Sequence, residues 1–288
     1  MKRLLITATT LAALTAVLMV GVQAQGRGGR QGGAAGGDAQ QGLTTNGGVR
    51  YINPGSPTIP DADINSKPIP RLPDGKIDIT GPWVGGGSNG DIERDGGLPA
   101  GTLMSIMTPS AKALFSTRKE EQNPHYACMP MAIPRTTPYP FRLVQLPTHK
   151  ATTHIFFLHE GNIHSYRQIF MDGRKHPAEP EPTWWGHSIG HYEGNTLVID
   201  TVGFNDRGWW DNKGYPHTEQ LHTIERWTRV DEGHMTVEVT IDDPGAYTKP
   251  FTVKFNARLS NPGDEIIEYI CQENNQYGVA GGYIQGAK

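Results

Sequence analysis

Residues 221–241, with the sequence LHTIERWTRVDEGHMTVEVTI, decide the fold of this chain. Apolar and polar side chains alternate along 234–241, with Met235, Val237, Val239 and Ile241 on one face, which is the two-residue period of a half-buried strand. Residues 221–230 are the predicted partner strand. Asp231, Glu232 and Gly233 separate the two runs and predict the turn of a β-hairpin. Two strands joined by so short a turn must be antiparallel.

The same pattern occurs on both sides of this hairpin. Turn residues at 193–195 separate predicted strands at 188–192 and 196–202, and turn residues at 261–264 separate strands at 252–259 and 266–271. Four earlier runs also read as strands, at 76–84, 141–146, 152–159 and 163–171.

One short helix interrupts this series. Thr108 is a suitable N-cap and Pro109 a suitable first helical residue, and the helix is expected to end near Gln122. Roughly nine strands in sequence predict a mainly β domain, an antiparallel calycin- or lipocalin-like barrel that closes and so has no free edge. An open β-sandwich is the alternative.

The first 24 residues predict export. Lys2 and Arg3 precede an uncharged run at 4–20, and Val22 and Ala24 supply small residues at the two positions that a signal peptidase reads. We expect cleavage after Ala24 and a periplasmic or secreted protein with no membrane span after cleavage; an uncleaved anchor helix is the alternative. Residues 25–73 are first Gly- and Gln-rich and then Pro-rich, which is typical of a tether. A single domain is expected at 74–288.

The cysteine count and the charge limit the compartment and the partners that this chain can have. Cys128 and Cys271 are the only two cysteines, and in an oxidising compartment they predict one disulfide. A metal pair or a catalytic thiol is the alternative. The net charge is −3 and the folded part has no cluster of Lys and Arg, which argues against nucleic acid or an anionic membrane as partner. Neither a G-x-S-x-G nucleophile elbow nor a dinucleotide fingerprint is present.

The densest group of reactive side chains follows the predicted strand at 196–202. The loop 203–219 is long for a hairpin and contains Asp206 and Arg207, and His217, Glu219 and His222 follow in an H-x-E-x-x-H pattern. On a strand His217 and Glu219 share a face, so the carboxylate would orient the imidazole as a general base near neutral pH. If a bulge intervenes, all three side chains are candidate ligands for a divalent metal. The third interpretation is a loop whose His and Glu bond backbone groups.

Aromatic residues near this group predict the wall of a ligand pocket. They are Trp184, Trp185, Tyr192, Trp209 and Trp210. His187 and His191 share one face of a predicted strand, where they either line the cavity, add metal ligands or face solvent. Arg167 is expected to point inward with its aliphatic neighbours and therefore to need a carboxylate partner, Asp200 or Glu225.

These residues predict a barrel that holds a small, apolar or aromatic molecule. The chemistry expected is proton transfer by a lyase, isomerase or hydrolase, with His217 as acid or base, Glu219 orienting it, and Arg207 or His222 stabilising negative charge. No cofactor is expected, unless the protein is a metal-dependent enzyme that binds a divalent ion. A non-catalytic binding protein and a structural envelope module are the competing hypotheses, and the oligomeric state is left open.

Seven segments, spread over nearly all of the chain beyond the tether, also carry a resemblance. They are PDGKIDITGPW (73–83), YPFRLVQ (139–145), RQIFMDGR (167–174), YEGNTLVIDTVGFND (192–206), HTEQLHTIER (217–226), GHMTVEVTIDDPGAYTKP (233–250) and EYICQEN (268–274). In these stretches the chain resembles a large family of exported, mostly uncharacterised bacterial proteins. The resemblance implies a shared calycin-like fold and carries no reaction.

Overall fold

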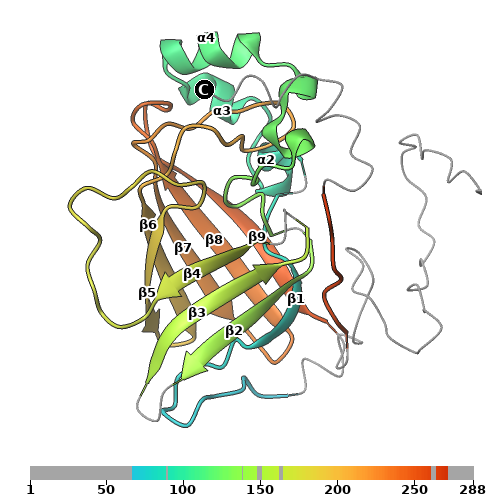
Figure 1. Cartoon of the computed structure of the whole chain (residues 1–288), viewed down its shortest axis with the longest axis vertical. Helices are drawn as coiled ribbons and strands as arrows, with labels where there is room; N and C mark the ends of the chain where they lie inside the picture. The colour runs from blue at the N-terminus through green and yellow to red at the C-terminus, as the bar shows by residue number, and fades with distance from the viewer. Residues whose placement is uncertain are drawn as a thin grey trace, which may run out of the picture. The chain divides into compact units, whose positions relative to one another are not determined.

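The hairpin around residue 232 is one part of a nine-stranded sheet that closes into a barrel in a computed structural model of the chain (Figure 1). The structure describes residues 67–88, 90–137, 139–147, 151–161, 165–260 and 264–271. All of them belong to the second of two compact units, 39–288. The predicted signal peptide at 1–24 and most of the predicted tether lie outside the described residues. Within the described residues, no helix is both long and apolar enough to cross a membrane.

The strands follow one another around the barrel in chain order, and β1 closes it by pairing with both β2 and β9. The closed barrel expected from the sequence is thus confirmed, and the open sandwich is not formed. The strands are β1 (Gly81–Gly85), β2 (Phe141–Pro147), β3 (Thr152–His159), β4 (Tyr166–Phe170), β5 (His187–Glu193), β6 (Thr196–Val202), β7 (His222–Arg229), β8 (His234–Asp242) and β9 (Phe251–Leu259).

The predicted strand at 266–271 does not form. Because β9 already pairs with β8 on one side and β1 on the other, the closed sheet has no edge left to receive it. This segment instead runs outside the ladder to Cys271.

One junction of the sheet differs from the antiparallel expectation. β4 and β5 pair in parallel, and only through Ile169 with Ser188 and Phe170 with Ile189. A parallel pair needs a crossover instead of a hairpin, and residues 171–186 supply it as a loop that stands out from the barrel wall (Figure 1). The first half of β4 is therefore left without a strand neighbour on its β5 side.

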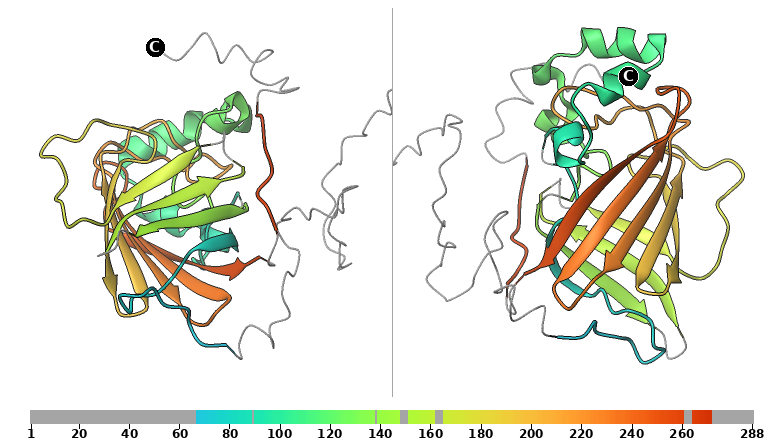
Figure 2. Two further views of the ribbon diagram at one scale, coloured as in Figure 1. Left: turned by 60° about the horizontal axis from the view of Figure 1, so that its bottom comes forward. Right: turned by 180° about the vertical axis from the view of Figure 1, so that it is seen from behind.

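Short helices gather at one end of the barrel (Figure 2). The predicted N-cap is confirmed, since the Thr108 side chain accepts a hydrogen bond from the Ala111 backbone at the start of α4 (Pro109–Thr117). The helix ends earlier than expected, and a separate 3-10 turn, η1 (Glu120–Gln122), follows it. The sequence did not predict α2 (Ile92–Asp95), α3 (Thr102–Ile106) or the 3-10 turn η2 (Pro124–Ala127), because four or five residues are too few to show a helical period.

Large aromatic side chains fill part of the barrel interior. Phe157 and Trp227 pack edge to face with ring centroids 5.1 Å apart, and Phe141 lies against both. Trp83, from β1, is fully buried, and its indole nitrogen donates to the Ile79 carbonyl at 2.9 Å. Trp227 alternates with the polar Arg226 and Thr228, and Phe141 is followed by Arg142, so at these positions the two-residue period of the strand builds the core directly.

The predicted disulfide is confirmed, with the Cα atoms of Cys128 and Cys271 5.6 Å apart. The two residues are separated by 143 positions in the sequence, so the bridge closes a long loop. In the chain-entropy model, a loop of this length stabilises the folded state by about 4–5 kcal/mol.

Candidate functional site

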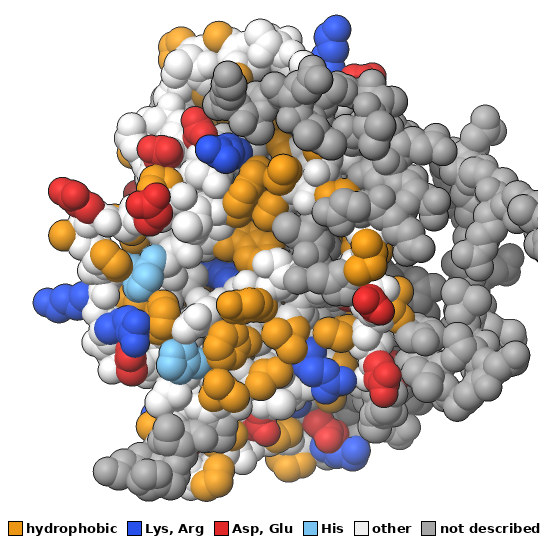
Figure 3. All heavy atoms as spheres, in the orientation of Figure 1, with side chains coloured by type: hydrophobic (Ala, Val, Ile, Leu, Met, Phe, Trp, Pro, Cys, Tyr) orange, Lys and Arg blue, Asp and Glu red, His pale blue; other side chains and the backbone are white. Residues whose placement is uncertain are grey.

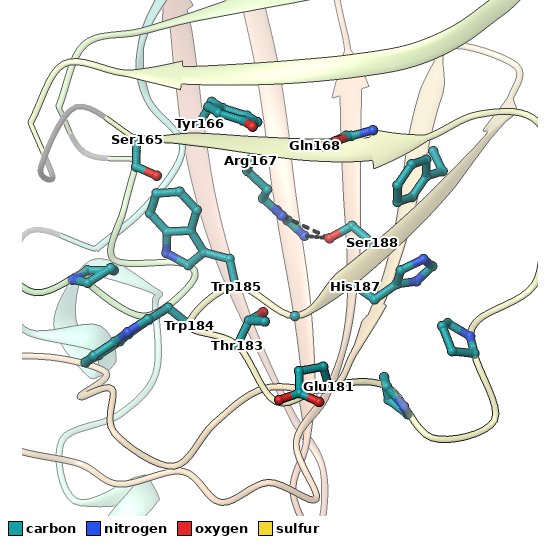
Figure 4. Close-up of a pocket in the computed structure, with 15 residues that line it drawn as sticks. Ser165, Tyr166, Arg167, Gln168, Glu181, Thr183, Trp184, Trp185, His187 and Ser188 are labelled. Carbon is teal, nitrogen blue, oxygen red and sulfur yellow. Dashed lines mark hydrogen bonds between the residues drawn. The ribbon is translucent and has the colours of Figure 1, made fainter. Parts of the chain in front are cut away.

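A pocket of about 640 Å³ lies in the barrel wall where β4 and β5 diverge (Figure 4). Its lining comes from β4, from the start of β5 and from the crossover loop between them, so the pocket exists because the parallel pairing is so short. Apolar rings dominate the lining: Tyr166, Phe170, Trp184, Trp185, Pro130, Pro177 and Pro180. The polar lining includes Arg167, Gln168, Glu181, Thr183, His187 and Ser188.

Arg167 forms the polar base of this pocket. Its side chain extends from β4 toward Ser188 of β5 (Figure 4), and both Nε and Nη2 donate to the Ser188 hydroxyl, at 3.1 and 3.0 Å. Nη2 also donates to Thr201 Oγ1 at 2.8 Å and to Glu225 Oε1 at 2.6 Å. Within the described residues, Nη1 has no hydrogen-bond acceptor. It is the donor left for a ligand.

The ion pair between Arg167 and Glu225 confirms the inward orientation expected from the sequence. The two side chains are 5% and 2% exposed. Asp200 is the other expected partner. It follows Ile199, the β6 residue that pairs with Glu225, and its carboxylate contacts His222 and His176 instead. The second carboxylate oxygen of Glu225 accepts from the Trp227 indole at 3.1 Å, so both oxygens are used. These additional hydrogen bonds matter because the attraction between two buried charges offsets their desolvation only when their remaining donors and acceptors are also paired.

Two tryptophans close the pocket toward the helical end of the barrel. Gly186, at φ 65°, lets the chain turn into β5, and a Cβ there would lie 2.5 Å from the Val202 carbonyl oxygen. Trp185, just before this turn, is buried and donates from its indole to the Met131 carbonyl at 2.9 Å. Trp184 is half-buried. The turn at Gly186 thus places both indole rings side by side in the chain, where they form an apolar wall of the pocket.

His159 lies behind Trp185, with ring centroids 5.3 Å apart. Burial, and secondarily the positive charge of Arg167, lowers the pKa of His159 to about 3. Its ring is therefore neutral at neutral pH and adds no charge to the base of the pocket.

The outer rim of the pocket carries a chain of imidazoles. His187 Nδ1 shares a hydrogen bond of 2.8 Å with His176 Nδ1, and His176 Nε2 lies 3.2 Å from Asp200 Oδ1. His222 Nε2 reaches the same Asp200 oxygen at 2.7 Å. Burial lowers the pKa of His187, and the neighbouring His176 and Arg174 lower it further, which favours the neutral ring.

The rim continues onto an aromatic surface. Phe156 and Tyr166 lie edge to face at 5.8 Å, and His154 and Phe170 at 5.5 Å, across neighbouring strands. Tyr166 is 59% exposed. Figure 3 shows hydrophobic side chains gathered over this face of the barrel, which β2 to β4 form. A flat apolar ligand would meet aromatic rings both at the mouth and inside the pocket.

The residues predicted from the H-x-E-x-x-H pattern do not come together. His217 is 2% exposed, packs against Trp210 at 5.0 Å, and neither ring nitrogen makes a hydrogen bond of normal geometry within the described residues. Burial, and then the charge of Arg118, lowers its pKa to about 4, against a smaller opposing effect of the Thr218 backbone. Glu219 is exposed, and His222 points to Asp200 on the outer face. A strand that began at 217 would have paired His217 with Glu219, but β7 begins at His222.

The segment 203–226 does not line the larger pocket, contrary to expectation. Asp206 and Arg207 are exposed, whereas Trp209 and Trp210 are buried beneath the helical end. Its loop folds inward as a packed layer, in which its tryptophans and His217 are buried, so these side chains do not reach the pocket between β4 and β5.

Three of the predicted ligand-binding residues, Trp184, Trp185 and His187, do line the pocket. Tyr192 and His191 do not. The Tyr192 hydroxyl accepts from Gln145, and the exposed His191 ring lies 3.0 Å from Glu193 Oε1.

Sequence reasoning missed Ser188 as a partner of Arg167 and missed His176 altogether. The alternation of β5, which directs His187 outward, also directs Ser188 inward, so its contact with Arg167 could have been predicted. His176 lies in an irregular loop, where no period reveals its direction.

No group of three or more His, Cys, Asp or Glu side chains in the described part of the chain has an arrangement that could hold a metal ion. The metal-dependent hypothesis built on His217, Glu219 and His222 therefore has no converging ligand set, since these three side chains face different directions.

Comparisons with known protein families, with curated proteins and with solved structures find no match to this chain. The resemblance to exported bacterial proteins thus identifies no family. The part of it that the structure supports is the closed nine-stranded barrel.

The buried ion pair predicts a large cost when one charge is removed. Glu225→Gln leaves the Arg167 charge buried without a counter-ion and should lower the free energy of unfolding by about 3 kcal/mol. The matched control is Glu238→Gln, which removes a carboxylate 2.6 Å from Lys254 in an exposed pair and should cost less than about 1 kcal/mol. Urea unfolding of the three proteins measures this, and equal midpoints for the two variants would show that Glu225 does not neutralise Arg167.

The burial of His217 predicts a pH dependence of stability. Its folded pKa of about 4 lies below its unfolded value of about 6.5, so between these values the unfolded chain binds the proton and stability falls as pH falls. His217→Leu removes this contribution, which amounts to about 3 kcal/mol between pH 7 and pH 4.

The measurement is urea unfolding of both proteins across that range. Other groups act in both: the raised pKa of Asp211, about 6, works in the opposite direction and cancels in the comparison. The wild type should lose more stability on acidification than His217→Leu. The exposed-surface variant His191→Gln should behave like the wild type. Parallel curves for wild type and His217→Leu would contradict the buried, neutral ring.

Proposed function

We propose that this protein is a small-molecule-binding β-barrel whose site is the pocket between β4 and β5. The observation that carries the proposal is Arg167, a nearly buried guanidinium held rigidly by Glu225 and Ser188 at the base of an aromatic pocket, with Nη1 left as a donor. Few, well-placed polar groups within an apolar lining are what ligand pockets generally have.

The charges around the pocket favour a neutral ligand. Glu225 already balances Arg167 from behind the pocket, and Glu181, the carboxylate among the lining residues, adds negative charge at the exposed side. A bound carboxylate would therefore be buried beside an already neutralised guanidinium, which costs desolvation without full compensation. A neutral hydrogen-bond acceptor such as a carbonyl oxygen needs only the Nη1 donor. The ligand class we propose is a flat, apolar or aromatic molecule bearing a neutral acceptor.

We also propose that the protein works outside the cytoplasm. The Cys128–Cys271 disulfide is typical of an oxidising compartment. Residues 1–24 have the order of a cleavable signal peptide, with the cut after Ala24, as the sequence indicates.

Three naphthalenes test the ligand class. 2-Acetylnaphthalene, 2-ethylnaphthalene and 2-naphthoate share the ring and differ in whether they carry a neutral acceptor, no acceptor or a negative charge. The ketone should bind about tenfold more tightly than the hydrocarbon, because one buried hydrogen bond is worth about 1.4 kcal/mol, and more tightly than the acid. Titration calorimetry on the mature protein measures all three affinities.

Two variants locate the binding. Trp184→Ala removes part of the pocket wall and should weaken the ketone about tenfold. Leu146→Ala removes an apolar side chain that is 45% exposed on β2, away from the pocket, and should change nothing. Tightest binding by the acid would assign an anionic ligand, and no binding by any of the three compounds would overturn the proposal.

A second candidate function is proton transfer in the same pocket. It is favoured by the hydrogen-bonded chain from Asp200 through His176 to His187, which lines the pocket. His187 Nδ1 is engaged by His176, so Nε2 of the neutral ring is the basic nitrogen. As base it would remove a proton from the carbon next to a ligand carbonyl, and Arg167 would stabilise the resulting enolate oxygen.

Deuterium exchange tests this directly. With 2-acetylnaphthalene in D₂O, removal of a methyl proton and return of a deuteron from solvent would replace the methyl protons, and proton NMR would record their loss. If the candidate is correct, His187→Gln should slow the exchange by at least about a hundredfold. His191→Gln, on the same face of β5 but outside the pocket, is the control. Exchange no faster than in buffer would leave binding as the function.

A further inference from the structure

A second cavity, of about 200 Å³, lies at the helical end of the barrel and is distinct from the pocket between β4 and β5. It is lined by the segment after β1, by η2, by the loop that follows Cys128 and by one residue of the loop 203–221: Ser88, Gly90, His125, Tyr126, Met131, Arg135, Tyr139 and Asn212. Met131 separates the two cavities, because its carbonyl accepts from the Trp185 indole of the larger one.

Arg135 is the only charged side chain of this lining apart from the titratable His125. It is 5% exposed, and within the described residues no carboxylate lies within 4 Å of its guanidinium. Its acceptors are amides instead: Nη2 donates to Asn212 Oδ1, and Nη1 reaches Asn123 Oδ1 at 3.5 Å. This differs from Arg167, which has a carboxylate at 2.6 Å.

Two carboxylates, Asp211 and Glu120, act on Arg135 through space, and neither forms an ion pair with it within the described residues. Asp211 Oδ1 accepts from the backbone of Lys213 and Gly214, at 2.9 and 3.0 Å. Burial raises the pKa of Asp211 to about 6, so its negative charge is itself disfavoured. A buried guanidinium without a contacting carboxylate carries a desolvation cost that an added anion would offset.

The rest of the lining supplies donors. The Tyr139 hydroxyl and the ring of His125 face a cavity to which the described lining contributes no Asp or Glu side chain. The hydroxyls of Ser88 and Tyr126 also line it, but they already donate to Asp95 Oδ2 at 3.2 Å and to Glu120 Oε1 at 2.8 Å. Guanidinium N–H and hydroxyl O–H groups are donors that proteins use to bind carboxylate and phosphate oxygens. The volume suits a molecule of a few heavy atoms.

We propose that the cavity around Arg135 binds a small oxyanion, which supplies the counter-charge that no described side chain places in contact with the guanidinium. Arg135 is the principal ligand, Asn212 holds its guanidinium toward the cavity, and Tyr139 and His125 are the further donors. The site is independent of the pocket between β4 and β5.

The test is thermal unfolding of the mature protein with sodium phosphate, sulfate or acetate, each compared with sodium chloride at the same ionic strength and pH. At about ten times its dissociation constant, a specific anion should raise Tm by about 3–5 °C over chloride. A larger shift with phosphate and sulfate than with acetate assigns a tetrahedral anion, and the reverse assigns a carboxylate.

Three variants place the effect. Arg135→Gln should abolish the shift. Asn212→Asp, which puts a carboxylate where Arg135 already donates, should also abolish it, and it decides the matter if Arg135→Gln does not fold. Arg229→Gln is the matched control: it removes another buried guanidinium, one that donates to the Asp78 and Glu232 carbonyls away from this cavity, and should keep the full shift. No shift in the wild type beyond chloride, or a shift that persists in Asn212→Asp, would overturn the proposal.

Discussion

The buried ion pair of Arg167 and Glu225 is the constraint on which the rest of the barrel wall depends. A guanidinium on an inward-facing strand position must find a carboxylate and further acceptors, because an unpaired buried charge costs several kcal/mol. Glu225 of β7, Ser188 of β5 and Thr201 of β6 meet this need from three different strands. The pair therefore joins β4 to strands across the barrel, in the region where its own pairing to β5 is weakest.

That weak pairing is also what creates the pocket. If β4 and β5 were joined by a hairpin, a longer ladder between them would close the wall beside Arg167. The β7–β8 hairpin, for comparison, has eight residue pairs. With two pairs, the wall opens and the crossover loop brings Trp184 and Trp185 to its edge. The same loop brings His176 to His187. Architecture and site thus have one origin, a crossover in a sheet that is otherwise antiparallel.

The sequence predicted the parts of this structure that depend on alternation. The bounds of β3 and β6, the closure of the barrel and the inward direction of Arg167 all follow from a period of two. The cost of a buried charge predicts a carboxylate partner for Arg167, Asp200 or Glu225, and the structure has Glu225. The disulfide followed from counting cysteines.

Other features depend on long-range packing, which no local pattern records. The parallel β4–β5 junction could not be predicted because β4 alone has the same alternation in either orientation. The meeting of His217 and Glu219 was inferred by extending strand geometry back from the strand expected at 221–230, whereas β7 begins at His222 and both residues precede it. Burial under Trp210 then separates His217 from Glu219. Arg135 lies in a Pro-rich loop, where spacing says nothing about which side chains meet.

The central claim is that Arg167 anchors a neutral ligand in the opening between β4 and β5. A crystal structure of the mature protein with 2-acetylnaphthalene tests it most directly. We expect the ketone oxygen within hydrogen-bond distance of Arg167 Nη1, with the rings against Trp184 and Trp185 and the Arg167–Glu225 pair intact. A ketone bound elsewhere, or bound in this pocket with its oxygen directed away from Arg167, would contradict it.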